Sequence, residues 1–136
     1  MCVLKIYSDT FSFKEFAGNT KIPIFSIFDK GEYRDQKRTR QVKENTLSID
    51  VSDKEWDDFP GQVSDAIGFL SKHHDELFGL LSRISDVKGC LDFPIYSRLN
   101  SNIINQNDYI PSELVCLAGK LNLDIGMSQY SKEAFE

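Results

Sequence analysis

The sequence predicts a single α+β domain, with an antiparallel sheet of four to five strands and one long and one or two short helices on one face, in a ferredoxin-like arrangement. Short runs of alternating apolar and polar residues predict the strands. A long segment with apolar residues at helical spacing separates two of these runs and predicts the main helix. The chain has 136 residues, enough for one core, so residues 1–136 are expected to form one domain with a frayed tail at 130–136.

The first part of the chain predicts three strands and a short helix. Alternation over residues 2–7 and 46–51 predicts two of the strands. Residues 11–17 can form about two helical turns. Residues 22–28 predict a further strand, which Pro23 confines to a sheet edge because proline cannot donate to a ladder. The polar and basic residues between 33 and 45 predict a long exposed loop.

The main helix is expected over residues 60–88. Proline is tolerated in a first helical turn, and Asp57 and Asp58, just before Pro60, are candidate caps whose charge suits the positive end of the helix dipole. Gly89 is expected to end the helix. Its apolar stripe should consist of Val63, Ile67, Leu70, Leu77, Leu81 and Ile84.

The last part of the chain predicts a strand, a loop, a second helix and a final strand. Residues 90–96 form the strand, which Pro94 places at an edge or a bulge. Residues 99–108 are rich in Asn and Ser and predict a flexible loop, and residues 123–130 alternate as a strand does. The inner side of the second helix should carry Leu114, Val115, Leu117, Ala118 and Leu121.

Composition narrows the class of protein. Hydrophobic residues make up 40% of the chain and aromatic residues 12%, as in globular proteins. No run is long enough to span a bilayer and the first residues lack the pattern of a signal peptide, so a cytoplasmic protein is expected. Cys2, Cys90 and Cys116 are too scattered for a disulfide framework and form no CxxC pair. Cys90 and Cys116 are expected to be reduced core residues.

Charge is unevenly distributed along the chain, whose net charge is −5. Residues 30–43 contain six basic and two acidic side chains, whereas residues 44–136 contain seven basic and sixteen acidic ones. The densest acidic group surrounds the lone Lys54 and consists of Asp50, Asp53, Glu55, Asp57 and Asp58. A basic loop followed by an acidic body predicts directional electrostatics.

No pattern indicates catalysis, and neither a cofactor nor a metal is expected. Neighbouring helical residues diverge by about 100°, so His73 and His74 cannot readily share a metal ion. The acidic group offers the oxygen ligands that magnesium or calcium prefers, but it lacks the spacing and the glycine of a calcium-binding hand. The sequence contains no glycine-rich phosphate loop and no GxSxG motif.

The favoured hypothesis is a non-enzymatic protein that binds a basic protein partner through an acidic surface. The expected partner-binding residues are Asp50, Asp53, Glu55, Asp57, Asp58, Arg38 and Arg40. Reversing the charge of any of the last four acids in that group is expected to spare the fold. Two alternatives stay open: a small metal-dependent hydrolase or nuclease using the acids and one histidine, and a nucleic-acid or ligand-binding module using residues 30–43. Nucleic acid is the less favoured partner because the sequence pI is near 5.0.

Several short segments follow one another along nearly the whole chain: Phe28-Asp29-Lys30-Gly31-Glu32 before the basic run, Ile95-Tyr96, Pro111-Ser112-Glu113-Leu114 and Leu121-Asn122-Leu123-Asp124-Ile125. In this order they resemble the domain of unknown function 4279 family of small bacterial proteins. The chain departs from the family at Leu47, where members commonly carry Trp. The family has no established enzymatic residues. Its members often resemble immunity proteins, cytosolic antidotes encoded beside secreted toxins, as in contact-dependent growth inhibition. The resemblance therefore implies a cognate toxin domain, for example a nuclease, as the partner.

Overall fold

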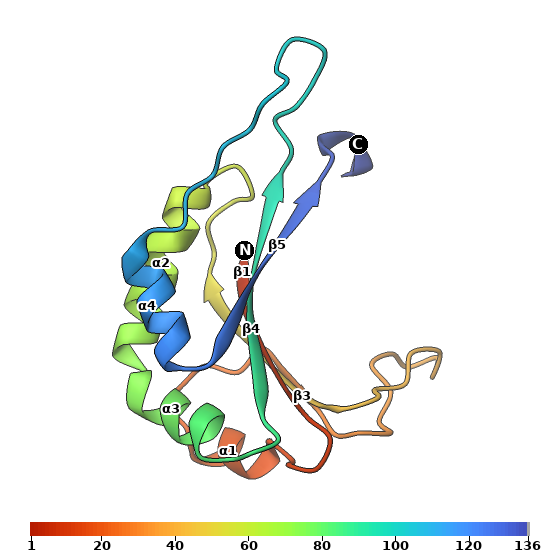
Figure 1. Cartoon of the computed structure of the whole chain (residues 1–136). Helices are drawn as coiled ribbons and strands as arrows, with labels where there is room; N and C mark the ends of the chain where they lie inside the picture. The colour runs from red at the N-terminus through yellow and green to blue at the C-terminus, as the bar shows by residue number, and fades with distance from the viewer. Residues whose placement is uncertain (136) are drawn as a thin grey trace.

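The structure has two layers, a sheet and a set of helices (Figure 1). The computed structural model describes the backbone of residues 1–135 and the side chains of residues 1–133. The strands in this part of the chain are β1 (Cys2–Ser8), β2 (Ser26–Phe28), β3 (Asn45–Ser52), β4 (Lys88–Tyr96) and β5 (Leu123–Tyr130). The helices are α1 (Lys14–Asn19), α2 (Phe59–Lys72), α3 (His74–Ser82) and α4 (Ser112–Lys120), followed by the 3₁₀ turn η1 (Lys132–Phe135). The predicted α+β class is confirmed.

The strands lie in the order β2-β3-β1-β4-β5. β1 is antiparallel to β3 and β4, and β2 is antiparallel to β3. β5 is parallel to β4, so the prediction of a wholly antiparallel sheet is wrong. The reason is α4, which carries the chain back along the sheet before β5 begins, as a parallel pair requires. The ferredoxin-like arrangement stays a prediction. That motif has the order β-α-β-β-α-β, and this chain has two elements beyond it, α4 and β5.

The core lies between the sheet and the helices. In β1 the residues alternate between buried and partly exposed, and Leu4 and Ile6 are fully buried. Leu4 pairs with Ile49 of β3 and Leu91 of β4, so one face of the three central strands forms an apolar layer. Leu70 of α2 is fully buried in the same cluster. This packing fixes β3, and the two charged segments of the chain begin at opposite ends of that strand.

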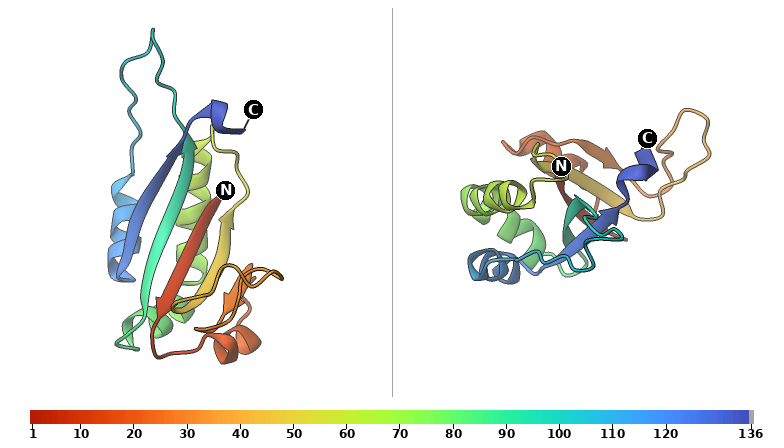
Figure 2. Two further views of the ribbon diagram at one scale, coloured as in Figure 1. Left: turned by 90° about the vertical axis from the view of Figure 1, so that its right-hand side faces the viewer. Right: turned by 90° about the horizontal axis from the view of Figure 1, so that it is seen from above.

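The other side of the sheet carries no helix, and we call it the open face (Figure 2). Alternation and register place on it Val3, Lys5, Tyr7, Thr46, Ser48, Asp50, Lys88, Cys90, Asp92, Tyr96, Asp124, Ser128 and Tyr130. At its centre, Lys5 Nζ lies 3.6 Å from a carboxylate oxygen of Asp92. The other oxygen of Asp92 accepts a hydrogen bond of 2.8 Å from Ser128 Oγ. The centre of the open face is therefore polar and internally paired.

The helix predicted over residues 60–88 is in fact two helices. His73 leaves the helical conformation with φ −107° and ψ 18°. Its backbone nitrogen donates to the carbonyl of Phe69 at 3.0 Å and ends α2, and its own carbonyl accepts from the nitrogen of Leu77 at 3.1 Å and begins α3. The break redirects the chain, so that Leu77 and Leu81 are buried beneath the other end of the twisted sheet.

α3 ends at Ser82, because Asp86 in the segment that follows forms hydrogen bonds with residues 8–10. A carboxylate oxygen of Asp86 accepts hydrogen bonds of 3.0 Å from Ser8 Oγ and from the backbone nitrogens of Asp9 and Thr10. The hydroxyl of Thr10 also donates to it, at 2.9 Å. Hydrogen bonds from the side chains of Thr10 and Ser8 lower the pKa of Asp86. Helical continuation to residue 88 would remove this connection between β1 and β4.

Gly89 and Pro94 both lie in β4, and each has a positional reason. A Cβ atom on Gly89 would collide with the side chains of Leu123 and Leu81, so this glycine marks a close approach and does not end a helix. β4 lies between β1 and β5, so the prediction of an edge strand is wrong. Pro94 is tolerated because the pairing of β4 with β1 stops at Asp92.

Three smaller expectations also need correction. β2 is shorter than the predicted strand 22–28, since regular pairing begins only after Pro23 has been passed. α1 covers Lys14–Asn19, so it begins and ends later in the chain than the predicted residues 11–17. Val115 is 52% exposed, because α4 is covered on one side only and its buried residues are Leu114 and Ala118. Residues 132–135 of the expected tail form η1, and residue 136 lies outside the described residues.

Candidate functional site

The acidic segment, residues 50–58, is called the acidic loop. It begins in the last residues of β3 and continues from the upper end of that strand in Figure 1. Asp50, Asp53, Glu55 and Asp57 are exposed, and the side chain of Asp53 is 96% exposed. The ammonium of Lys54 lies 3.7 Å from Asp53, and it lies 3.5 Å from the carboxylate of Asp65 in α2. The loop thus presents a group of solvated carboxylates at one end of the sheet.

Asp58 differs from the other acids because it is structural. It is the N-cap of α2, and its carboxylate accepts a hydrogen bond of 2.9 Å from the nitrogen of Gly61. A Cβ atom at residue 61 would collide with this carboxylate, so the cap requires the glycine. The predicted cap is confirmed. The expectation that reversal of Asp58 spares the fold is not supported by this contact, because the substitution would remove the cap.

An aromatic cluster joins the acidic loop to the open face. The ring of Trp56 stacks on Tyr130, with centroids 4.7 Å apart and planes 25° apart, and it lies 5.3 Å from the ring of Tyr96. The backbone nitrogen of Tyr96 donates to the carbonyl of Trp56 at 3.1 Å. The prediction missed this role of Trp56. The available signal was the single tryptophan of the chain, in the middle of its densest acidic run.

Two further contacts hold the acidic loop. The amide nitrogen of the fully buried Gln62 donates to the carbonyls of Glu55, at 3.1 Å, and Pro94, at 3.0 Å. The amino group of Met1 donates to the carbonyl of Lys54 at 2.9 Å. Burial lowers the pKa of that amino group, against the opposing attraction of Glu55 and its acidic neighbours. The loop is therefore fixed by the start of α2, which is itself bound to β4, and by the distant N-terminus.

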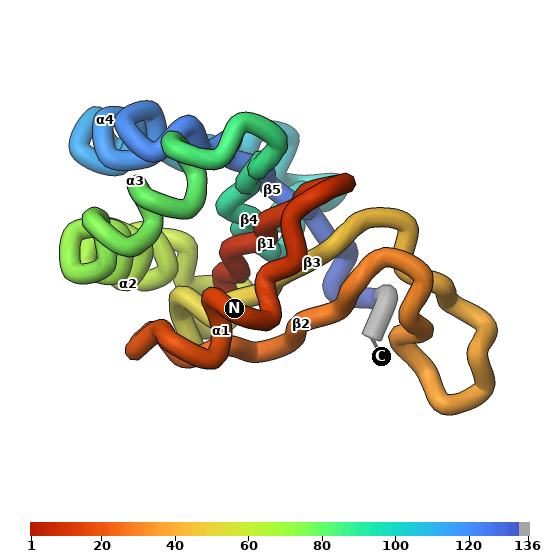
Figure 3. Tube along the Cα trace, turned by 90° about the horizontal axis from the view of Figure 1, so that it is seen from below, coloured from red at the N-terminus to blue at the C-terminus, as the bar shows by residue number. Residues whose placement is uncertain are grey.

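The second charged segment, residues 30–43, is called the cationic arm and projects from the side of the sheet opposite the helices (Figure 3). The sequence predicts an exposed loop here, and the structure adds backbone hydrogen bonds between its two limbs. The nitrogen of Gly31 donates to the carbonyl of Val42 at 2.9 Å, and the nitrogen of Arg34 donates to the carbonyl of Arg40 at 2.9 Å. A single bridge pairs Tyr33 with the opposite limb.

Asp35 closes the tip of the cationic arm. One carboxylate oxygen accepts from the backbone nitrogens of Thr39, at 2.9 Å, and Arg40, at 3.1 Å, and the other accepts from the hydroxyl of Thr39. The hydrogen bond from the Thr39 side chain is the main reason that the pKa of Asp35 is lowered. Arg38 completes the turn with a left-handed φ of 56°. The Asp35 carboxylate thus builds the tip and places one negative charge near Arg40.

The other acidic residue of the arm, Glu32, forms an ion pair with a residue outside the arm. Glu32 lies 2.6 Å from the ammonium of Lys14, outside the arm. Among the described residues, no carboxylate lies within ion-pair distance of Lys37, Arg38, Arg40 or Lys43, and all four are exposed. The arm is therefore an ordered projection that carries unpaired positive charge.

Aromatic side chains accompany the cations at the base of the arm. The guanidinium of Arg34 lies 5.1 Å from the ring centre of Phe28, and that of Arg38 lies 5.8 Å from the ring centre of Tyr33. Burial is the main reason that the pKa of Tyr7, on the adjacent open face, is raised, while Lys5 and Arg34 oppose the shift.

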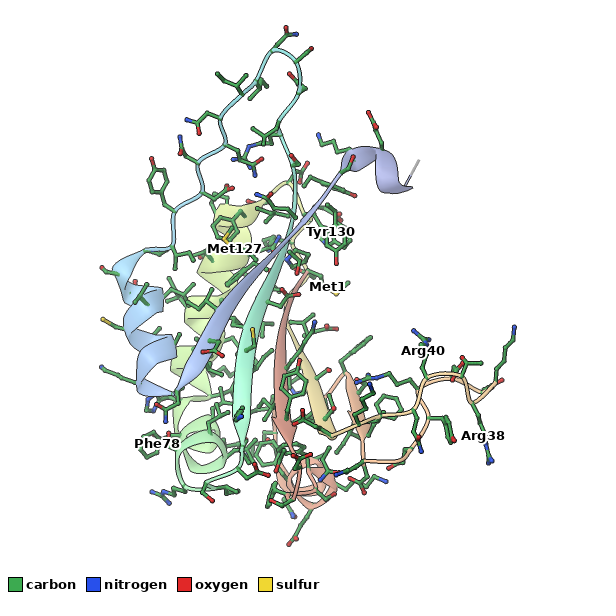
Figure 4. All side chains as sticks on the ribbon, turned by 45° about the vertical axis from the view of Figure 1, so that its right-hand side comes forward. Met1, Arg38, Arg40, Phe78, Met127 and Tyr130 are labelled. Carbon is green, nitrogen blue, oxygen red and sulfur yellow. The ribbon has the colours of Figure 1, made fainter. Side chains whose placement is uncertain are left out.

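The structure separates the two groups of predicted partner-binding residues. Arg38 and Arg40 lie on the cationic arm, which projects to the right of the sheet in Figure 4, whereas the acidic loop follows the other end of β3. β3 has eight residues, which corresponds to a separation of about 26 Å. The two groups border the same open face but do not form one patch.

The residues considered for metal binding and for the core are also placed. The described part of the chain contains no group of three or more His, Cys, Asp or Glu side chains able to hold a metal ion. His73 lies against the ring of Phe69, and His74 Nδ1 is 3.5 Å from Asp75. Neither of the expected core cysteines is buried, so that expectation is wrong: Cys90 is partly exposed on the open face, and Cys116 is exposed on the outer side of α4.

A long loop, residues 97–110, rises above the acidic loop in Figure 1. Its tip exposes Ile104 by 89% and Ile103 by 46%. At its base, Arg98 lies 3.0 Å from the carboxylate of Asp108, and the backbone nitrogen of Ser97 donates to the carbonyl of Tyr130 at 2.8 Å. Sequence composition identified the loop but not these contacts, which place it beside the aromatic cluster.

A scan against models of protein families found no match, and searches of curated proteins and of solved structures returned no similar protein. The resemblance to the domain of unknown function 4279 family stays a prediction. No helix in the described residues has the length and apolar character needed to cross a bilayer.

Proposed function

We propose that this chain is a non-enzymatic, cytoplasmic immunity protein that binds and neutralises a basic toxin domain, such as a nuclease. The docking surface is the upper end of the open face, where the acidic loop carries Trp56 against Tyr96 and Tyr130. The observation that carries the proposal is the stack of Trp56 on Tyr130 among exposed carboxylates. Interfaces commonly combine an aromatic centre with a charged rim.

The rim and the centre contribute differently to such an interface. Asp53, Glu55 and Asp57 are exposed, so they would increase the rate of encounter with a positive surface and favour the correct orientation. Trp56 and Tyr130 supply large, rigid apolar area. A nuclease active site is a suitable target, because the residues that bind phosphate give it a positive surface.

The experiment is a co-expression assay with the basic toxin domain encoded beside this chain. The wild-type chain should restore growth of cells that produce the toxin, and binding of the purified pair should be measurable by calorimetry. The triple variant Asp53→Lys, Glu55→Lys, Asp57→Lys should weaken binding by about 100-fold and abolish rescue. The triple variant Asp75→Lys, Glu76→Lys, Glu113→Lys makes the same charge change on the helical side and should rescue growth.

The proposal is wrong if both triple variants, shown to be folded by circular dichroism, protect cells equally well. It is also wrong if the wild-type chain does not bind the neighbouring toxin domain at all. A metal-dependent hydrolysis of nucleic acid by the purified chain alone would support the enzymatic alternative.

A further inference from the structure

The open face has opposite charges at its two ends, and neither end can satisfy the other within one molecule. The cationic arm carries Lys37, Arg38, Arg40 and Lys43 without a carboxylate partner among the described residues. The acidic loop carries the exposed Glu55 and Asp57, for which no cation within ion-pair distance is found in the same part of the chain. The length of β3 keeps the two segments apart.

From this complementarity we infer that the occupant of the open face is a second copy of this chain. Two copies face each other with their β3 strands antiparallel, and each cationic arm contacts the acidic loop of the other copy. The arrangement has twofold symmetry, so both contacts form at once and each copy uses the same residues, as in most soluble dimers. The arm is suited to this contact because it already projects away from the helices (Figure 2).

A second copy fits the open face better than a nucleic acid does. Residues 44–136 contain sixteen acidic side chains against seven basic ones. The open face itself carries Asp50, Asp92 and Asp124 against Lys5 and Lys88, and Asp92 is paired with Lys5. The acidic excess of this part of the chain would weaken the binding of a polyphosphate strand along the face. In the antiparallel pair, the negative end of each face meets a positive arm.

The order of the free arm favours this pairing. Asp35 and the backbone hydrogen bonds between the two limbs hold Arg38 and Arg40 in position before any contact is made. Preorganisation reduces the entropy lost on association. Tyr33, which is 39% exposed at the base of the arm, would be covered by the second copy.

The dimer and the toxin complex would both occupy the acidic loop. The two states therefore exclude each other, and the dimer keeps the docking surface covered until a partner with higher affinity displaces the arm. The dimer is a property of this chain alone, so its failure would not affect the proposed function, and a failure of toxin binding would not affect the dimer.

The experiment is sedimentation equilibrium of the purified chain, whose monomer mass is 15.6 kDa. A mass approaching twice that value is expected at low salt and high protein concentration. The dissociation constant should rise at least about tenfold when NaCl is raised from about 0.05 M to about 0.5 M, because screening weakens contacts between exposed charges. A chain that stays monomeric under all these conditions overturns the inference.

A charge exchange tests the pairing itself. The arm variant Arg38→Glu, Arg40→Glu and the loop variant Asp53→Lys, Asp57→Lys should each be monomeric. When the two variants are mixed, each reversed segment meets one of its opposite sign, so a heterodimer should form. An equimolar mixture that stays monomeric, with both variants folded, overturns the inference.

Matched controls separate this contact from a general effect of charge. The variant Lys72→Glu, Lys120→Glu makes the same change as the arm variant on α2 and α4 and should dimerise like the wild type. Fluorescence anisotropy with a labelled single-stranded oligonucleotide provides a second control. Binding of the oligonucleotide that is lost in the arm variant, with no dimer in the wild type, would assign the arm to nucleic acid and overturn the inference.

Discussion

The acidic loop and the cationic arm begin at opposite ends of β3, and they are held in different ways. The acidic loop depends on distant parts of the chain: Trp56 stacks on Tyr130 of β5, and the amino group of Met1 donates to the carbonyl of Lys54. The arm depends mainly on itself, through Asp35 at its tip and the hydrogen bonds between its two limbs.

This difference predicts how each segment responds to change. A segment held by tertiary contacts is coupled to the stability of the whole domain, so substitutions in it should lower the free energy of unfolding. A segment held by local hydrogen bonds should change its own order and leave the domain intact.

The first prediction concerns the core that positions both segments. Leu70→Asp places a carboxylate at a fully buried position against the sheet and should abolish cooperative unfolding, since its cost of several kcal/mol approaches the stability of a typical domain. Thermal denaturation followed by circular dichroism measures this. The control Ile104→Asp introduces the same side chain where exposure is 89% and should change stability by less than about 0.5 kcal/mol. Equal behaviour of the two variants would contradict the packing described here.

The second prediction concerns the aromatic cluster. Trp56→Ala removes the stack on Tyr130 and the contact with Tyr96, and should lower the free energy of unfolding by about 2 kcal/mol. Urea denaturation gives this value. Tyr33→Ala removes an aromatic ring from the arm and should cost less than about 0.5 kcal/mol. If the arm variant loses more stability than the loop variant, the contrast between the two segments is wrong.

The sequence predicted those parts of the fold that depend on local pattern. Alternation located β1, β3 and β5, and the acidic residues before Pro60 located the cap at Asp58. The break at His73 could not be predicted, because the apolar stripe continues through it at helical spacing. The break reflects the twist of the sheet that the two helices cover, which is a tertiary property.

The candidate site was predicted in charge but not in geometry. The sequence identified the acidic residues and Arg38, yet the distance between the two groups depends on β3 lying between them as one strand. The role of Trp56 depends on β5 as the neighbour of β4, a parallel pairing that alternation cannot specify. Cys116 was placed in the core because its segment is apolar, whereas α4 buries only one side.

The third prediction compares two carboxylates that each bind backbone nitrogens. Asp58→Ala removes the N-cap of α2 and should lower the free energy of unfolding by about 1 kcal/mol, measured by urea denaturation. Asp35→Ala removes similar hydrogen bonds at the tip of the arm and should leave the global value unchanged. It should instead accelerate hydrogen exchange at the amides of Thr39 and Arg40. Loss of global stability in the Asp35 variant would show that the arm is not independent.

The fourth prediction is the smallest effect, a local transition with pH. The pKa of Asp35 is lowered in the folded chain, chiefly by the hydroxyl of Thr39. The contribution of Asp35 to the order of the arm is therefore fully present above the unfolded pKa of 3.8. That contribution is lost as the pH falls through the lower folded pKa, where protonation removes the negative acceptor. The amide signals of Thr39 and Arg40 should then shift in an NMR titration, while those of the acidic loop around Trp56 keep their dispersion. Asp35→Asn has no such titration and serves as the control. A simultaneous loss of signal dispersion in both segments would mean that acid unfolds the whole domain first, and that the arm has no separate transition.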